Sequence, residues 1–71
     1  MKILQFGGYD VGAPSVYLPL ERIMSFRMID FNGRYGTEIS LPEGRYIRVL
    51  ESPDVVKSMI EAAVLDAYNN D

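Results

Sequence analysis

The chain has 71 residues, no cysteine, no histidine and a net charge of −3. This length predicts a single domain spanning 1–71, near the lower limit for independent folding. The absent side chains exclude disulfides and thiolate metal sites and remove the usual general base near neutral pH, so we expect no enzyme and no cofactor or metal. The negative charge disfavours nucleic acid as a partner.

The apolar fraction of 48% and the charged fraction of 24% are typical of a globular protein rather than a disordered one. No apolar run has the length of a membrane span. The first six residues also lack the long apolar region of a signal peptide. We therefore expect a cytoplasmic location without membrane insertion.

Two short strands are predicted near the N-terminus, over 2–6 and 15–20. Pro19 places the second strand at an edge or a strand end, because proline cannot donate to a ladder. The glycine-rich segment 7–14 between them has the glycines of a phosphate cradle, but it lacks the Walker lysine and the dinucleotide spacing. We interpret it as a mobile connection or a partner-contact loop.

Two turn signals predict a three-stranded antiparallel meander over about 23–50. Asn32-Gly33 is the strongest signal for a two-residue hairpin, and Pro42-Glu43-Gly44 predicts a second turn. Each turn sets one strand register, and the two registers agree. Together they place seven apolar residues on one face: Met24, Phe26, Met28, Ile39, Leu41, Ile47 and Val49. A slip of one residue would mix polar and apolar side chains on that face.

The opposite face of the meander carries a polar row in which Arg27, Glu38 and Arg48 are cross-strand neighbours. One interpretation is a binding site for an anion or a partner, formed by Arg27 and Arg48 with Tyr46 and Arg45 beside them. The other, which we favour, is a surface ion-pair row worth about 0.2–1 kcal/mol per pair.

A helix is predicted after the meander. Ser52 suits the N-cap, Pro53 the first helical position and Asp54 the positive end of the helix dipole. An apolar stripe follows at spacings of three and four residues: Val56, Met59, Ile60, Ala63, Val64 and Ala67. The expected fold is α+β, a small curled antiparallel sheet of two short N-terminal strands plus the meander, covered by one C-terminal helix.

Apolar residues also fall on the polar face of the meander, namely Ile29, Phe31 and Leu50 beside Gly36. One helix covers only one face, and a cluster of exposed apolar residues suggests a contact surface. Small domains often gain stability by associating. We therefore predict a non-enzymatic protein-binding or assembly module, a self-associating accessory protein that uses this patch. A larger protein assembly is a further candidate partner. The alternative function is a small-ligand binder that captures an anionic metabolite or nucleotide at the arginines.

The segment 20–63 resembles the small flagellar-operon proteins of the FlbD/SwrD type. The similarity is carried by Ile39, Leu41, Gly44, Val49, Glu51, Ser52 and Val56, which read I-x-L-x-x-G-x-x-x-x-V-x-E-S-x-x-x-V. Leu20-Glu21-Arg22-Ile23 is similar to that family's approach to its first hairpin strand, whereas 7–14 and 32–35 depart from its compact pattern. The resemblance implies a non-enzymatic helper of flagellar motor function. The same architecture would serve a phage-encoded or accessory protein that docks on a larger machine.

Overall fold

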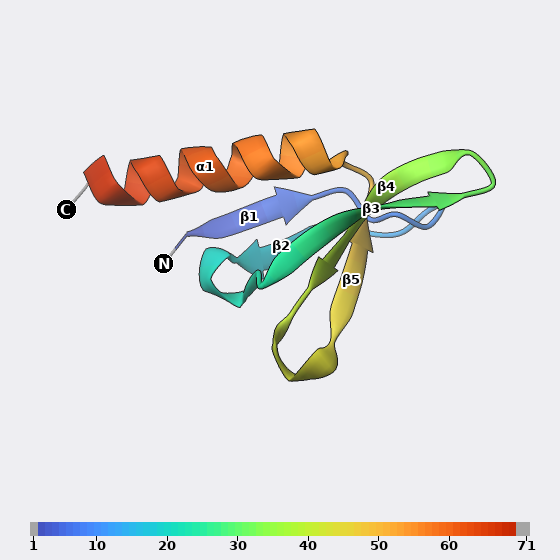
Figure 1. Cartoon of the computed structure of the whole chain (residues 1–71), viewed down its shortest axis with the longest axis horizontal. Coiled ribbons are helices and arrows are strands. Elements are labelled where there is room, and N and C mark those ends of the chain that lie inside the picture. The colour runs from blue at the N-terminus through green and yellow to red at the C-terminus, as the bar shows by residue number, and fades with distance from the viewer. Residues whose placement is uncertain (1, 70–71) are drawn as a thin grey trace.

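The computed structural model describes residues 2–69. Five strands precede one helix: β1 (Ile3–Phe6), β2 (Val16–Pro19), β3 (Ser25–Phe31), β4 (Arg34–Ser40), β5 (Tyr46–Val49) and α1 (Pro53–Asn69) (Figure 1). The strands form two antiparallel sheets, of order β1-β2 and β3-β4-β5, and the described residues form no closed barrel. The predicted α+β architecture is confirmed.

The β3-β4 hairpin turns at Asn32 and Gly33, which both have positive φ, at 56° and 85°. This is the backbone that a two-residue type I′ turn requires. Phe26 pairs with Ile39, which in turn pairs with Ile47 of β5, so both predicted registers are confirmed. In the second turn Glu43, and not only Gly44, adopts a left-handed conformation.

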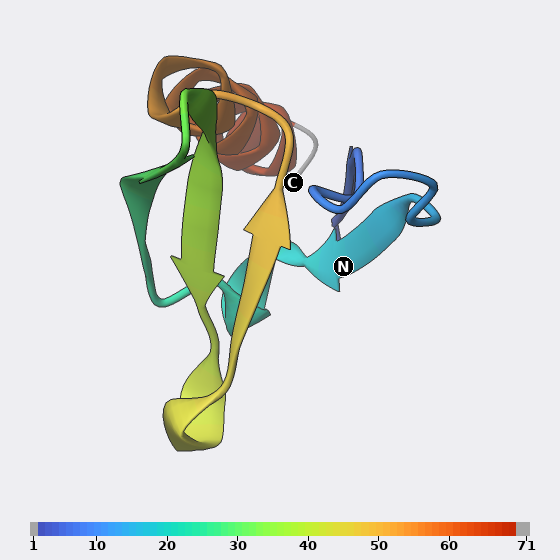
Figure 2. The same ribbon diagram turned by 90° about the vertical axis from the view of Figure 1, so that its right-hand side faces the viewer.

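The two sheets meet where the end of β1 reaches the outer edge of β5. Gly8 forms an isolated bridge to Val49, and the Leu50 amide donates to the Gly7 carbonyl at 2.9 Å. The Gly7 amide donates in turn to both carboxylate oxygens of Glu51, each at 3.0 Å. Figure 2 shows the consequence: the N-terminal hairpin lies on the β5 side of the meander, and β3 is the opposite edge.

The hydrophobic core lies between the inner face of the meander, the N-terminal hairpin and α1. Its buried members are Leu4, Phe6, Leu18, Ile39, Val49, Val56 and Ala63. Phe26, Leu41 and Ile47 are partly buried against this cluster, as the predicted pattern requires. The buried Thr37 hydroxyl donates to the Glu51 carbonyl at 2.6 Å, so this polar side chain of the core has a hydrogen-bond partner.

Two residues predicted on the buried face, Met24 and Met28, are instead 67% and 60% exposed. The reason is the position of β3 at the edge of the sheet. On the inner face, the fully buried side chains of the meander are those of Thr37, Ile39 and Val49, which belong to β4 and β5, while Phe26 of β3 is only partly buried. The edge strand therefore keeps apolar side chains outside the core.

The helix begins as predicted. The Ser52 hydroxyl accepts a hydrogen bond from the Val55 amide at 3.3 Å, and Pro53 is the first helical residue. Val56 and Ala63 of the predicted stripe are buried, but Val64 is exposed. The stripe is therefore narrower than the sequence suggested.

The first testable prediction concerns the packing of α1. Val56→Asp would place an unpaired charge at a fully buried position, which typically costs about 3–5 kcal/mol. That is close to the whole stability of a small domain, which starts at about 5 kcal/mol. We expect loss of the cooperative thermal transition by circular dichroism. Ser58→Asp, on the exposed side of the same helix, should melt like the unsubstituted protein. A normal transition for Val56→Asp would contradict the packing.

Candidate functional site on the outer face of the sheet

Tyr9, from the loop between β1 and β2, covers part of the outer face of the meander. A β-carbon added to Gly36 would lie 2.7 Å from Cδ1 of Tyr9, so the ring rests directly on the glycine backbone. The Tyr9 hydroxyl donates to the Arg34 carbonyl at 2.6 Å. The Arg34 guanidinium donates to the Tyr9 carbonyl and lies 4.7 Å from the ring centroid. The loop is therefore docked on the sheet.

This docking changes the predicted interface patch. Ile29, the cross-strand neighbour of Gly36, is only 8% exposed and cannot serve as an exposed contact residue as predicted. Phe31 and Leu50 are each 49% exposed. Leu50 lies against Gly7, whose added β-carbon would be 3.2 Å from its Cδ1. The patch is divided by the loop instead of being continuous.

Sequence reasoning missed Tyr9, although one signal pointed to it. A glycine inside a strand often marks a place where another group approaches the backbone closely. Gly36 is such a glycine, and its predicted neighbours on the outer face were apolar. The sequence does not indicate which distant aromatic residue fills the gap.

The predicted polar row is present. Arg27 donates to Oε1 of Glu38 through Nε at 3.1 Å and through Nη2 at 2.9 Å. Nε of Arg48 lies 3.5 Å from Oε2 of the same carboxylate. The Glu38 side chain is largely buried, whereas that of Arg27 points into solvent. Two cations therefore share one carboxylate, as the register predicted.

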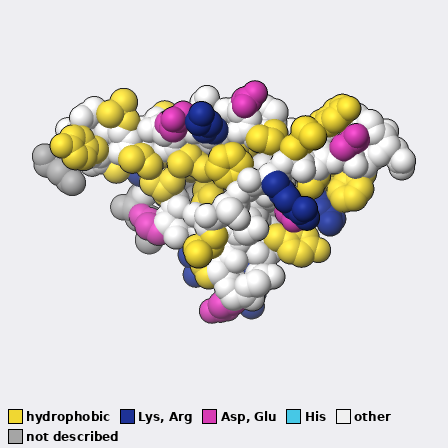
Figure 3. All heavy atoms as spheres, in the orientation of Figure 1, with side chains coloured by type: hydrophobic (Ala, Val, Ile, Leu, Met, Phe, Trp, Pro, Cys, Tyr) yellow, Lys and Arg dark blue, Asp and Glu magenta, His cyan; other side chains and the backbone are white. Residues whose placement is uncertain are grey.

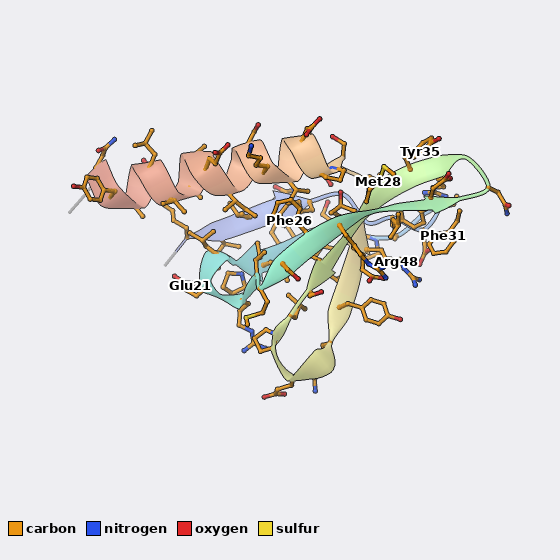
Figure 4. The ribbon with its side chains drawn as sticks, in the orientation of Figure 1. Glu21, Phe26, Met28, Phe31, Tyr35 and Arg48 are labelled. Atoms are coloured by element: carbon orange, nitrogen blue, oxygen red, sulfur yellow. The ribbon has the colours of Figure 1, made fainter. Side chains whose placement is uncertain are left out.

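Arg48 differs from Arg27 because aromatic rings surround it. Its Cζ lies 5.0 Å from the ring centroid of Phe31 and 5.3 Å from that of Tyr46. Figure 4 shows Phe31 and Arg48 together on the side of β3 away from α1. Nε of Arg48 is buried and has no hydrogen-bond partner within residues 2–69. Each cation–π contact contributes about 0.5–1 kcal/mol at an exposed site, so the two rings favour this position of the guanidinium.

A pocket of about 360 Å³ lies between the β1-β2 loop and β5. Its lining includes Arg48, Tyr46, Tyr9 and Asp10. Of the four predicted binding residues, the structure therefore brings Arg48 and Tyr46 to the pocket, while Arg27 and Arg45 lie outside its lining. Asp10 adds a carboxylate, so the pocket offers both a cation and an acceptor.

Other large apolar side chains are exposed outside this site. Four belong to β3, its approach or the adjoining strand: Met24, Met28, Phe31 and Tyr35. Three more belong to the second half of α1, Val64, Leu65 and Tyr68, which line a shallow apolar depression with Ile60 and Glu61. In Figure 3 hydrophobic side chains form a band that runs below α1 towards the β3-β4 hairpin.

The described part of the chain offers no cluster of three or more acidic side chains that could hold a metal ion. Within the same residues, α1 is too short and too polar to cross a membrane.

The second prediction concerns Tyr9. Tyr9→Ala should lower the free energy of unfolding by about 3 kcal/mol, because it removes a buried aromatic ring that packs on Gly36 and Phe31. Tyr9→Phe keeps the ring and loses only the hydrogen bond to Arg34, so about 1 kcal/mol is expected. Urea denaturation at one fixed protein concentration measures both values. Equal stability of Tyr9→Ala and the unsubstituted protein would show that the loop is not docked.

No protein-family model, curated protein or solved structure matches the chain.

Proposed function

We propose that the protein is a non-enzymatic assembly module that binds a second copy of itself through the apolar margin of β3. This margin consists of Met24, Met28, Phe31 and Tyr35. The supporting observation is that these four large exposed side chains lie along β3, the edge strand of the meander whose outer side no other described strand touches. Figure 4 shows Met28 and Tyr35 on the α1 side of this hairpin and Phe31 on the other, so apolar groups flank both faces.

The small size of the chain makes burial of this margin a large contribution to stability. Fully burying one large apolar side chain contributes about 1.5–3 kcal/mol. The four side chains of the margin are between 49% and 67% exposed, so burying their exposed parts would contribute about 3–7 kcal/mol in total. That is comparable to the core of a domain this small, which rarely supplies more than about 3–5 kcal/mol. Association would bury these side chains, which the fold of the single chain leaves exposed.

The charges near the margin support an apolar partner. Arg27 is held by Glu38, and the Asp30 carboxylate accepts a hydrogen bond from the Gly33 amide at 2.8 Å. Both charged groups would therefore keep their partners within the chain if an apolar surface covered the margin. A second copy supplies such a surface, and a two-fold contact covers both margins in one step.

The resemblance to the flagellar-operon proteins implies the same class, a non-enzymatic helper. We further propose that the assembled protein docks on a larger protein machine and that it is located in the cytoplasm.

The third prediction tests self-association by sedimentation equilibrium at micromolar concentration. We expect a dimer or larger oligomer for the unsubstituted protein and a single-chain mass for Met28→Glu. Val11→Glu is the matched control, because Val11 is 88% exposed and lies in the β1-β2 loop rather than in the β3 margin. Circular dichroism checks that both variants fold. A single-chain mass for the unsubstituted protein would refute self-association, and an oligomer of Met28→Glu would refute the chosen surface.

A second candidate function is capture of a small anionic metabolite or nucleotide in the pocket beside β5. The observation that favours it is the guanidinium of Arg48, which lies against two aromatic rings and lines that pocket. A guanidinium suits phosphate and carboxylate groups because it donates several hydrogen bonds in a fixed plane. Tyr46 would stack on a planar ring only by leaving Arg48, so a phosphate-bearing ligand fits better than a purely aromatic one.

The fourth prediction tests this second candidate by isothermal titration calorimetry with ADP and with inorganic pyrophosphate. Arg48→Gln should abolish the binding heat. Arg27→Gln removes the other arginine of the row, which lies outside the pocket lining, and should retain at least half of the affinity. Absence of binding to the unsubstituted protein at millimolar ligand would exclude this function. So would equal losses in both variants, since these would indicate only the general charge of the face.

A further inference from the structure

The free edge of β3 lacks most of the devices that protect an edge strand. Natural edges are shortened, interrupted by proline or a bulge, marked with charged side chains and above all lysine, or covered by another segment. The seven residues of β3 contain neither lysine nor proline, and they pair with β4 in one unbroken register. Their two charged residues, Arg27 and Asp30, are already engaged by Glu38 and by the Gly33 amide. Among residues 2–69 no strand pairs with the other side of β3.

The other edges of the molecule are treated differently. β2 has only four residues and ends in Pro19. The outer edge of β5 is occupied at its end by the bridge between Gly8 and Val49. β3 is thus the long, regular edge on which a further strand can pair.

The hairpin register decides which backbone groups of β3 face outwards. A two-residue turn makes Phe31 and Arg34 a hydrogen-bonded pair, and such pairs alternate along an antiparallel ladder. Phe26, Met28 and Asp30 therefore direct their amides and carbonyls away from β4. Continued along β4 to Leu41, the same alternation directs the Leu41 amide towards β5. The observed hydrogen bond of 2.8 Å from this amide to the Arg45 carbonyl agrees with that direction.

We infer that β3 pairs antiparallel with β3 of a second copy, about a two-fold axis at Met28, and joins two meanders into one six-stranded sheet. This inference rests on the proposed function and gives it a geometry. The axis at Met28 places outward-facing residues opposite each other, with Phe26 opposite Asp30 of the second copy, and it engages all seven residues of the strand.

Neighbouring registers are less favourable. An axis at Arg27 would place two guanidinium groups directly opposite each other, and like charges in that position are destabilising. An axis at Ile29 would engage only 27–31. An axis at Phe26 would pair only residues 25–27, because β3 begins at Ser25.

The side chains of the β3 margin agree with the axis at Met28. The two Met28 side chains meet on the inner face. On the outer face Arg27 lies diagonal to Phe31 of the second copy, within the reach of a long side chain. The Arg27 side chain is mostly exposed and Phe31 half-exposed in the single chain, so both have room for a cation–π contact across the axis.

The fifth prediction uses the absence of cysteine, which makes a single introduced thiol unambiguous. Opposed residues of a hydrogen-bonded pair have α-carbons about 5.5 Å apart. That separation lies within the range of about 4.4–6.8 Å that a disulfide spans. Met28→Cys should therefore form a covalent dimer as the main product of mild oxidation at low micromolar concentration. Met24→Cys is the matched control, because this position is equally exposed but lies far from its own counterpart across the axis. That variant should remain mostly a single chain on a non-reducing gel.

Met28→Pro provides a second arm. It removes an amide that faces the free edge and no amide of the β3-β4 ladder, so the domain should fold but sediment as a single chain. Suppose that the unsubstituted protein is an oligomer. If Met28→Cys then fails to cross-link, or if folded Met28→Pro keeps the oligomer mass, the edge pairing is overturned but self-association stands. A single-chain mass for the unsubstituted protein overturns both. Should Met28→Pro not fold, the cysteine pair decides alone.

Discussion

The register imposed by the turn at Asn32-Gly33 is the constraint on which the other features depend. It places Gly36 on the outer face and Thr37 on the inner face of the same strand. The glycine is then available for the ring of Tyr9, and the threonine hydroxyl for the carbonyl of Glu51. A shift of one residue would exchange the two faces and place the threonine against Tyr9. The same register also determines which amides of β3 remain free at the edge.

A three-stranded meander has two faces, and one helix covers only one of them. The N-terminal segment contributes side chains to both faces. The β1-β2 hairpin contributes Leu4, Phe6 and Leu18 to the inner core, while the loop between its strands carries Tyr9 to the outer face. The chain passes from one face to the other at Gly7 and Gly8, beside the edge of β5. A β-carbon on Gly8 would lie 2.5 Å from the Pro14 carbonyl oxygen, so only glycine allows the loop to close this tightly. The glycines that resembled a phosphate cradle in the sequence thus have a structural role.

The features that sequence analysis predicted correctly are those fixed by neighbouring residues. The turn dipeptide and the serine cap each act within a few positions, and the strand registers and the cap were confirmed. The features it missed depend on which distant segments meet. Met28 has the spacing of a core residue but is exposed at the edge strand. Ile29 has the spacing of a surface residue but is buried, and its cross-strand neighbour Gly36 carries the ring of Tyr9.

The candidate site shows the same division. The row of Arg27, Glu38 and Arg48 follows from the register alone, and it was predicted. The difference between the two arginines was not, because it arises from the rings of Phe31 and Tyr46 and from a pocket wall supplied by the β1-β2 loop. Only the folded chain distinguishes an arginine exposed to solvent from one that lies against aromatic rings.

Phe31 connects the two candidate surfaces. Its ring contacts Arg48 on one side and meets the ring of Tyr9 edge-on at 6.0 Å, yet half of the side chain is exposed in the β3 margin. A second copy that covers this exposed part would remove water from the contact between Phe31 and Arg48, and cation–π attraction strengthens when the pair is desolvated. Assembly through β3 would therefore hold Arg48 more firmly beside its pocket. By the reciprocity of linked equilibria, an anion that binds more tightly when the guanidinium is in this position would favour assembly to the same degree.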